Sequence, residues 1–252
     1  MARKVSRRKM PPREKHMVKE ALKIEEGIFD MRTMMALEKV FTHNIVSKLD
    51  FMIAKGKEAD IYLADPGTKI DAEVVILKIF RIETSSFTKR INYISGDPRF
   101  EKIKINPINV INTWAKKEYG NLKIAAIAGI HSPKPYYFKS NIIAMEFIGD
   151  DAVPAQTLKE AGTPDPDKTL NIIIEDIRKL YKNELVHGDV SQYNVLMKGT
   201  VPYLIDFGQA VVIRHPNAMD FLKRDVANIL SFFKKQYGVV RDGEATFKYV
   251  IN

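Results

Sequence analysis

Apolar residues alternate with polar ones, or form short continuous runs, between positions 49 and 80. Three such runs are rich in β-branched and aromatic residues and are separated by turn-like Lys-Gly-Lys and Asp-Pro-Gly sequences; they cover residues 49–54, 60–64 and 73–80. Runs of this length bounded by glycine and proline are typical of strands joined by tight turns. The pattern therefore predicts an antiparallel meander of three strands.

Apolar residues recur at helical spacing on both sides of this meander. Residues 15–46 predict one or two amphipathic helices, broken near Gly27. Residues 114–127 predict another helix, which should end near Gly129, a residue suited to a C-terminal cap. Two further apolar runs predict a fourth and a fifth strand at 136–138 and 141–147.

The rest of the chain is mainly helical or weakly patterned. Residues 169–181 and 221–233 each place apolar side chains on one helical face, and residues 185–212 between them contain two short apolar strands. Residues 81–111 are polar and basic, and we expect a long functional or mobile loop there. Residues 1–15 are rich in Lys and Arg and predict a flexible basic arm.

Composition narrows the class of protein. The 252 residues contain 45% hydrophobic and 28% charged residues, which is ordinary for a globular chain. Cysteine is absent, which excludes disulfides and thiolate metal sites and favours a cytoplasmic location.

No apolar run suits a membrane span or a secretory signal, so no membrane partner is expected. The net charge of +9 favours an acidic partner such as RNA, although most basic stretches are simply solvated surface.

The most specific motif lies between the two C-terminal helices. His187-Gly188-Asp189 is followed by Asn194 five residues after the aspartate, and Asp206-Phe207-Gly208 ends an apolar strand twelve residues later. This spacing is that of the catalytic and metal-binding loops of protein kinases. Single Asp and Asn residues are often turn formers, but that alternative does not account for the whole set.

The residue types suit phosphoryl transfer from ATP. Asp206 offers a carboxylate and Asn194 a neutral oxygen to Mg²⁺, which neutralises phosphate charge. Asp189 can orient an incoming hydroxyl and accept its proton. We therefore expect Asp189 and Asp206 to be catalytic, and Asn194 and Asp206 to be the metal ligands.

A kinase site also needs a lysine on the third strand and a glutamate on the following helix. Lys78 lies in the apolar run 73–80, where an unpaired ammonium would be costly, so the functional interpretation is favoured. Glu118 in the predicted helix is the expected partner, with an exposed surface glutamate as the alternative. Its neighbours Lys116 and Lys117 are expected to be ordinary surface charges.

The rest of the nucleotide site is predicted more by position than by motif. Residues 56–59 have a single glycine where the usual phosphate loop has three, yet Gly56 still permits close approach of the backbone to phosphate. Residues 145–148 should offer backbone hydrogen bonds to adenine, and apolar side chains should cover its faces. The expected cofactor-binding residues are Ile53, Gly56, Lys57, Glu58, Ala59, Ile76, Lys78, Met145, Glu146, Phe147, Ile148, Leu196 and Ile205. For each apolar residue taken singly, ordinary core packing is an almost equal alternative.

These motifs resemble the RIO family of atypical serine/threonine protein kinases. The resemblance runs from about residue 49 to residue 237 and rests on residues 56–59, 185–194, 205–211, 215–216 and 221–228. Ala59 follows Gly-Lys-Glu where a serine is the alternative, and in this the chain resembles the type-one subfamily, which includes archaeal proteins. Gly188 and Gln192 depart from the usual alanine and glutamate. Ser191 stands two residues after Asp189, where conventional kinases carry a lysine and RIO proteins do not.

The resemblance implies an α+β, two-lobed protein-kinase-like fold. Its N-lobe would contain an antiparallel five-stranded sheet with one helix, its C-lobe would be reduced and mainly helical, and extra helices would precede both. The corresponding boundaries are a basic arm at 1–15, a helical segment at 16–48, the N-lobe at 49–148 with the loop 81–111, and the C-lobe at 149–252. Only 46 residues follow Asp206, and no Ala-Pro-Glu occurs among them, so a conventional peptide-substrate site is not expected.

The resemblance also implies an activity and partners. These are ATP with Mg²⁺ or Mn²⁺ as cofactors, serine autophosphorylation, and ATP hydrolysis linked to maturation of the small ribosomal subunit. The expected partner would be ribosomal RNA or a pre-ribosomal particle, and DNA is not expected to bind. The resemblance leaves the oligomeric state open. Asp206 would itself be transiently phosphorylated. Candidate serine and threonine acceptors in the loop are Thr84, Ser85, Ser86, Thr88 and Ser95.

Two other functions remain open at this point. One is a catalytically silent, nucleotide-binding module that interacts with RNA or a pre-ribosome. The presence of Lys78, Asp189, Asn194 and Asp206 together favours an active enzyme over it. The other is a small-molecule kinase of the aminoglycoside or choline type, which does not explain the Gly-Lys-Glu-Ala loop or the basic arm.

Overall fold

A five-stranded antiparallel sheet forms the core of the N-lobe. The computed structural model describes residues 29–81, 87–100 and 105–252, and the sheet has the order β1-β2-β3-β5-β4. Its strands are β1 (Val46–Lys55), β2 (Ala59–Pro66), β3 (Val75–Phe80), β4 (Pro135–Lys139) and β5 (Ile142–Glu146). The predicted meander and the two later strands are confirmed. Lys78 lies on the central strand, opposite Ile61 of β2 and Ile143 of β5.

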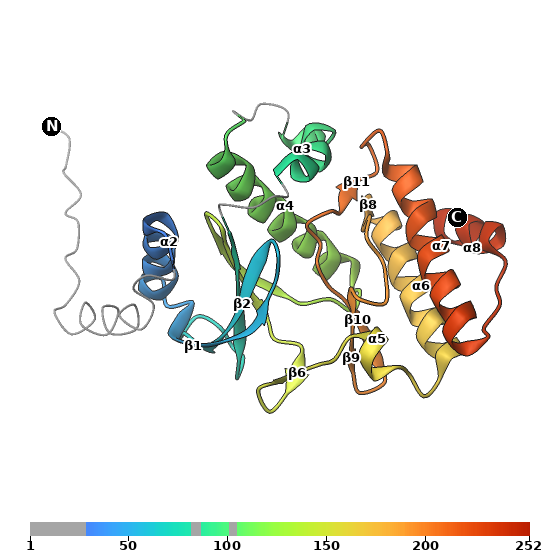
Figure 1. Ribbon diagram of the computed structural model, residues 1–252, viewed down its shortest axis with the longest axis horizontal. Coiled ribbons are helices and arrows are strands. Elements are labelled where there is room, and N and C mark those ends of the chain that lie inside the picture. Colours follow the sequence, from blue (N-terminus) through green and yellow to red (C-terminus); the bar gives the residue numbers. More distant parts are fainter. Residues whose placement is uncertain (1–28, 82–86, 101–104) are drawn as a thin grey trace, which may run out of the picture.

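Helix α4 (Pro107–Ala128) packs against β4 and β5 and reaches the C-lobe (Figure 1). Its end at Gly129, with φ 64°, is as predicted, but its start is seven residues earlier than the predicted Trp114. The reason is that Asn106 caps the helix by accepting from the backbone N–H of Asn109, while Pro107 occupies the first turn, where its missing N–H costs nothing. The pair Asn106-Pro107, which in the sequence suggested a loop, is therefore the start of a helix.

The long loop predicted at 81–111 is wrong over much of its length. Residues 87–95 form helix α3 (Phe87–Ser95), a 3₁₀ turn η1 (Pro98–Phe100) follows, and α4 begins before position 111. Ile94 is buried and Ile91 packs against the same core, at a spacing that places both on one helical face. The remaining residues, 82–86 and 101–104, lie outside the described part of the chain.

Helix α2 (Met31–Thr42) covers the face of the sheet opposite to α4 (Figure 1). Asp30 caps it by accepting from the backbone N–H groups of Arg32 and Thr33. The predicted N-terminal helical segment is confirmed for residues 31–42, but its predicted end at residue 48 is wrong, because β1 already begins at Val46. The basic arm and residues 16–28 lie outside the described residues.

The C-lobe is built on two long helices, α6 (Pro166–Lys182) and α7 (Ala218–Tyr237), in agreement with the predicted helical faces. The C-terminal helix α8 (Gly243–Ile251), which the sequence pattern did not predict, packs on both. Its smaller elements are α5 (Leu158–Ala161), β6 (Gly149–Asp150), β7 (Val153–Pro154), β8 (Leu185–Val186), β9 (Val195–Lys198), β10 (Val201–Leu204) and β11 (Val211–Val212). β9 pairs with β10 and β8 with β11, so the two loops that carry the kinase-like motif emerge from paired strands.

The predicted α+β, two-lobed fold is therefore confirmed, with α4 shared between the lobes. One hydrophobic cluster joins α4 to α6, α7 and the short strands, and a second joins α2 to the sheet. Among the described residues, no helix combines the length and the apolar character that a membrane span requires.

Leu37 tests whether α2 is part of the folded N-lobe. Its side chain is fully buried in the cluster between α2 and the sheet, while Met35 on the same helix is 61% exposed. Leu37→Ala should lower the free energy of unfolding by about 2–5 kcal/mol in urea titrations, because it leaves a cavity. Met35→Ala is the control and should change it by less than about 0.5 kcal/mol. Equal effects of the two substitutions would show that α2 does not pack as described.

Candidate active site

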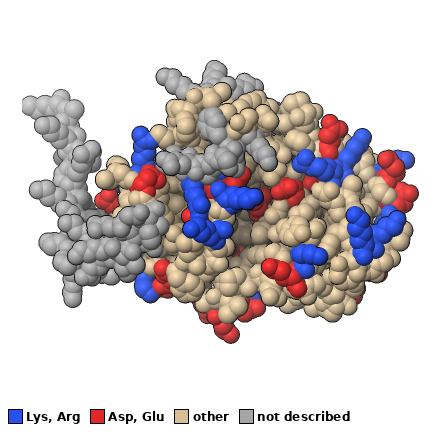
Figure 2. Space-filling view, in the orientation of Figure 1, with Lys and Arg blue, Asp and Glu red and all other residues tan. Residues whose placement is uncertain are grey.

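A cleft of about 620 Å³ lies between the two lobes. Figure 2 shows a hollow near the middle of the displayed face, with basic side chains beside it and acidic side chains within it. The cleft is lined by every residue expected to bind cofactor, together with Glu118, Asn194 and Asp206: Ile53, Gly56, Lys57, Glu58, Ala59, Ile76, Lys78, Met145, Glu146, Phe147, Ile148, Leu196 and Ile205. Of the predicted site residues, only Asp189 lies just beyond this lining.

Apolar side chains from both lobes line the cleft. Ile53 and Ile76 approach from the N-lobe, and Leu196 and Ile205 from the C-lobe. The backbone N–H of Ile148 donates no hydrogen bond within the described part of the chain, although the carbonyl of the same residue accepts from Ala155. Two apolar walls and a free backbone donor are what a flat heteroaromatic base requires.

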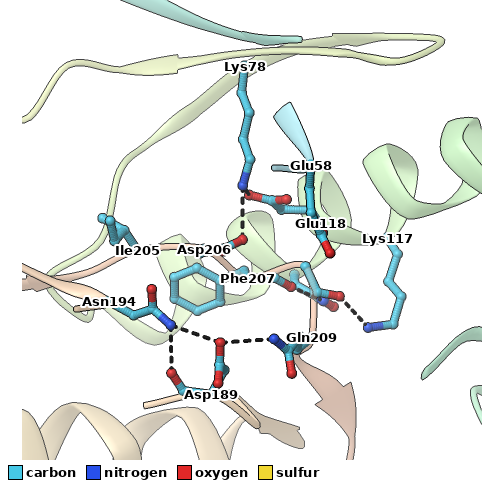
Figure 3. A network of polar contacts seen from close by, with 12 residues as sticks. Glu58, Lys78, Lys117, Glu118, Asp189, Asn194, Ile205, Asp206, Phe207 and Gln209 are labelled. Atoms are coloured by element: carbon cyan, nitrogen blue, oxygen red, sulfur yellow. Dashed lines mark hydrogen bonds and ion pairs between the residues drawn. The ribbon is translucent and has the colours of Figure 1, made fainter. Parts of the chain in front are cut away.

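Lys78 connects the two lobes through two carboxylates. Its Nζ lies 2.7 Å from Oε1 of Glu118 on α4 and 2.9 Å from Oδ1 of Asp206 (Figure 3). Burial lowers the pKa of Lys78, but the carboxylates of Asp206 and Glu118 outweigh it and hold the pKa above its ordinary value. The Lys78 ammonium in turn lowers the pKa of Asp206. Burial raises the pKa of Glu118 to about 7, and the ammonium of Lys78 opposes this rise.

Asp206 and Asn194 present oxygen atoms to the same part of the cleft. Asp206 has a positive φ of 63°, which is uncommon outside glycine, and its side chain remains 47% exposed. The Nδ2 of Asn194 donates to the backbone carbonyl and to Oδ2 of Asp189, at 2.8 and 2.9 Å. Because the amide nitrogen faces Asp189, the amide oxygen faces the other way (Figure 3). One carboxylate and one amide oxygen fit a Mg²⁺ ion that shares its remaining positions with phosphate and water.

Asp189 is held by its own loop and by the segment after Asp206. Oδ2 accepts from Asn194 and also from Nε2 of Gln209, at 2.9 Å in both cases. Burial, together with the carboxylate of Asp206, raises the pKa of Asp189 above its ordinary value. A raised pKa makes this carboxylate a stronger base towards a bound hydroxyl.

A buried carboxylate on α7 supports the backbone of this loop. Asp225 accepts from the N–H groups of Gly188 and Val190, at 2.7 and 2.9 Å, and burial raises its pKa to about 7. Gly188 has φ 76°, and a Cβ there would lie 3.2 Å from the carbonyl oxygen of Gln209. Glycine in place of the usual alanine therefore suits the backbone of this loop.

Lys117 was expected on the surface, and this prediction is wrong. Its side chain is fully buried, with Nζ 2.8 Å from the carbonyl of Gly208 and also bonded to that of Ala210. Asn121, one turn later on α4, donates to the carbonyls of Phe207 and Ala210. Burial lowers the pKa of Lys117 to about 7. Lys116 is exposed, as expected.

The turn between β1 and β2 is tight at Gly56. The N–H of Gly56 donates to the carbonyl of Ala59 at 3.0 Å, and a Cβ on Gly56 would lie 2.7 Å from that oxygen. Glu58 lines the cleft, and its carboxylate lies 3.3 Å from the guanidinium of Arg90 on α3. Sequence reasoning did not find Arg90, because α3 lies within the stretch expected to be a loop.

Comparison with known proteins agrees with this geometry. Residues 60–246 match the RIO domain. The chain belongs to the RIO family. It is 37% identical over 228 residues to the RIO-type serine/threonine-protein kinase Rio1 of Haloferax volcanii, a match that covers 90% of this chain and 77% of the relative. It is 37% identical to Rio1 of Methanocaldococcus jannaschii, with 86% and 73% coverage, and 35% identical to human serine/threonine-protein kinase RIO1, with 89% and 40% coverage. The expected family and type-one subfamily are therefore confirmed.

A solved structure shows the same fold. The Rio2 kinase from Chaetomium thermophilum, crystallised as an ADP/Mg²⁺-phosphoaspartate complex, matches this RIO protein with a TM-score of 0.65 at 24% identity. The match covers 88% of this chain and 67% of that chain. A second crystal structure of the same Rio2 kinase matches with a TM-score of 0.64. The kinase-like architecture of the RIO chain is thus supported by sequence and by fold.

The buried Lys117 gives a prediction about stability and pH. Its pKa is about 7 in the folded chain and about 10.5 when solvated, so between these values only the unfolded chain binds the proton. The free energy of unfolding of the wild type, minus that of Lys117→Met, should therefore rise by about 1 kcal/mol per pH unit above pH 7. Urea unfolding at pH 7, 8 and 9 measures it.

The neighbouring exposed lysine is the matched control. The same difference taken for Lys116→Met should stay flat over this range, because that side chain is solvated in both states. A flat difference for Lys117→Met as well would mean that Lys117 remains protonated inside the protein.

Proposed function

We propose that this RIO protein is an ATP- and Mg²⁺-dependent serine/threonine kinase and ATPase. The observation that carries the proposal is that Lys78, Asn194 and Asp206 line one cleft with apolar walls, and that Asp189 is bonded to Asn194 at its margin. These are the parts that phosphoryl transfer requires, and they come from three separate stretches of the chain. The serine/threonine-kinase names of its relatives support the same activity.

Each residue has a defined task in this function. Lys78 holds the α- and β-phosphates, and Glu118 keeps its ammonium directed into the cleft. Asp206 and Asn194 hold Mg²⁺, which supplies charge neutralisation of the phosphates when bound. Asp189 orients the acceptor hydroxyl and accepts its proton. The tight turn at Gly56 lets backbone N–H groups approach the phosphates, with Lys55 and Lys57 beside it.

The acceptor is proposed to be a serine of this chain, water, or transiently Asp206. The phosphoaspartate in the Rio2 complex supports the last of these by analogy. Of the candidate hydroxyls, Thr88 and Ser95 lie on α3, and Thr84, Ser85 and Ser86 lie outside the described residues. In the cytoplasm, the partner is proposed to be a pre-ribosomal small subunit with its RNA, supported by the net charge of +9.

Substitution of the two aspartates tests the mechanism. Asp189→Ala should lower steady-state ATP turnover by about 10²- to 10⁴-fold, because the proton acceptor is lost, and should leave nucleotide affinity nearly unchanged. Asp206→Ala should abolish both turnover and the Mg²⁺ dependence of nucleotide binding. Free phosphate release and calorimetric titration with ADP measure the two quantities. Asp220→Ala, an exposed aspartate on α7, is the control. Wild-type turnover in both variants would reject this mechanism.

The fate of the γ-phosphate separates the acceptors. Incubation with γ-labelled ATP and Mg²⁺ should release labelled phosphate and label the protein. Loss of the protein label in hydroxylamine would identify an acyl phosphate on Asp206, whereas a resistant label would identify a hydroxyl acceptor. If no phosphate is released and no label is found, with or without ribosomal particles, the chain is a silent nucleotide-binding module.

A further inference from the structure

Asp189 is held in place by two neutral amides. Asn194 and Gln209 both donate to Oδ2, at 2.9 Å each, while Oδ1 has no hydrogen bond within the part of the chain that the structure describes. A carboxylate can only accept, so both amides must present their NH₂ groups to it. Two donors on one oxygen fix the rotation of the carboxylate, and the second oxygen is left for an acceptor (Figure 3).

The side chain of Gln209 is directed by a rigid backbone. Gly208 packs against Trp114 so closely that a Cβ would lie 2.9 Å from the indole nitrogen. On either side of Gln209, Lys117 binds the carbonyls of Gly208 and Ala210. The amide is therefore preorganised by α4, and it need not be ordered when a substrate binds.

Gln209 also accounts for a feature of the catalytic loop that the proposed function leaves open. Ser191 stands two residues after Asp189, where conventional kinases carry a lysine. No hydrogen bond joins the Ser191 side chain to Asp189 among the described residues, and Gln209 reaches the carboxylate from the metal-binding segment instead. A neutral amide directs the carboxylate without adding a positive charge beside the acceptor.

We propose that Gln209 is a positioning residue for phosphoryl transfer, which holds Oδ2 of Asp189 so that Oδ1 faces the acceptor. This role rests on the proposed function, in which Asp189 is the proton acceptor. The acceptor oxygen forms a bond to the γ-phosphorus and gives its proton to Oδ1. The bond from the γ-phosphorus to the bridging oxygen breaks, and ADP leaves with that electron pair.

Gln209→Met in the full chain tests this role, since methionine has a similar length and no donor. The kcat for ATP turnover should fall about 10- to 100-fold, as expected for a lost hydrogen bond to a charged group. The KM for ATP and the affinity for ADP should change less than about twofold, because the amide acts on the acceptor side. Gln236→Met, an exposed glutamine on α7, is the matched control and should keep wild-type kcat. A loss that appears in KM alone would overturn the proposal.

Gln209→Glu separates the amide donor from packing, because it keeps the shape of the side chain and removes the donor. It should lose at least as much kcat as Gln209→Met, with thermal unfolding confirming that both variants are folded. Wild-type kcat in Gln209→Glu would overturn the positioning role.

A double-mutant cycle with Asp189→Ala is decisive. In that background Gln209→Met should cause no further loss, because no carboxylate remains to be positioned. An equal loss in both backgrounds would show that Gln209 acts independently of Asp189. If Asp189→Ala left ATP turnover unchanged, the proposed function itself would fail. If Asp189→Ala lowered turnover but Gln209→Met did not, only the positioning role of Gln209 would fail.

Discussion

The ammonium of Lys78 must be paired, and much of the molecule is arranged around that requirement. A cation on the central strand of a sheet is costly unless carboxylates compensate its lost hydration. Glu118 and Asp206 supply them at 2.7 and 2.9 Å, one from α4 and one from the C-lobe. The two ion pairs of Lys78 therefore connect the sheet to α4 and to the segment that contains Asp206. These are the parts that a nucleotide site needs.

Helix α4 carries this assembly further than the ion pairs alone. Its residues 117 and 121 share one face at a spacing of four, and Glu118, three residues before Asn121, adjoins that face; all three are buried. Glu118 binds Lys78 of the N-lobe, while Lys117 and Asn121 bind carbonyls of residues 207–210. Because one rigid helix holds both partners, their separation is set by the helix itself. A displacement of α4 would break the Lys78 ion pair and loosen the backbone around Gln209 together.

The sequence predicted the features that depend on local pattern and motif spacing, and missed those that depend on distant partners. The strands followed from short apolar runs, and Asp189, Asn194 and Asp206 from their spacing. Lys117 looked solvated because its acceptors, the carbonyls of Gly208 and Ala210, lie some ninety residues later in the chain. Helix α3 was missed because its sequence is largely polar. Which side chains bind ATP, metal or acceptor stays a prediction until the variants are measured.

The charges in the cleft are distributed unevenly, and this bears on the acceptor. Lys78 and the lysines beside Gly56 place positive charge where the phosphates of the proposed nucleotide lie. Around Asp189, two neutral amides bind the carboxylate, and Arg224 is bonded to the carbonyl of Gly188. Positive charge attracts the triphosphate, whereas among the described residues the side chains bonded to the carboxylate of Asp189 are neutral. In the proposed function this arrangement favours a neutral hydroxyl or water over an anionic acceptor, because the neutral amides bonded to Asp189 do not offset its repulsion of a second anion.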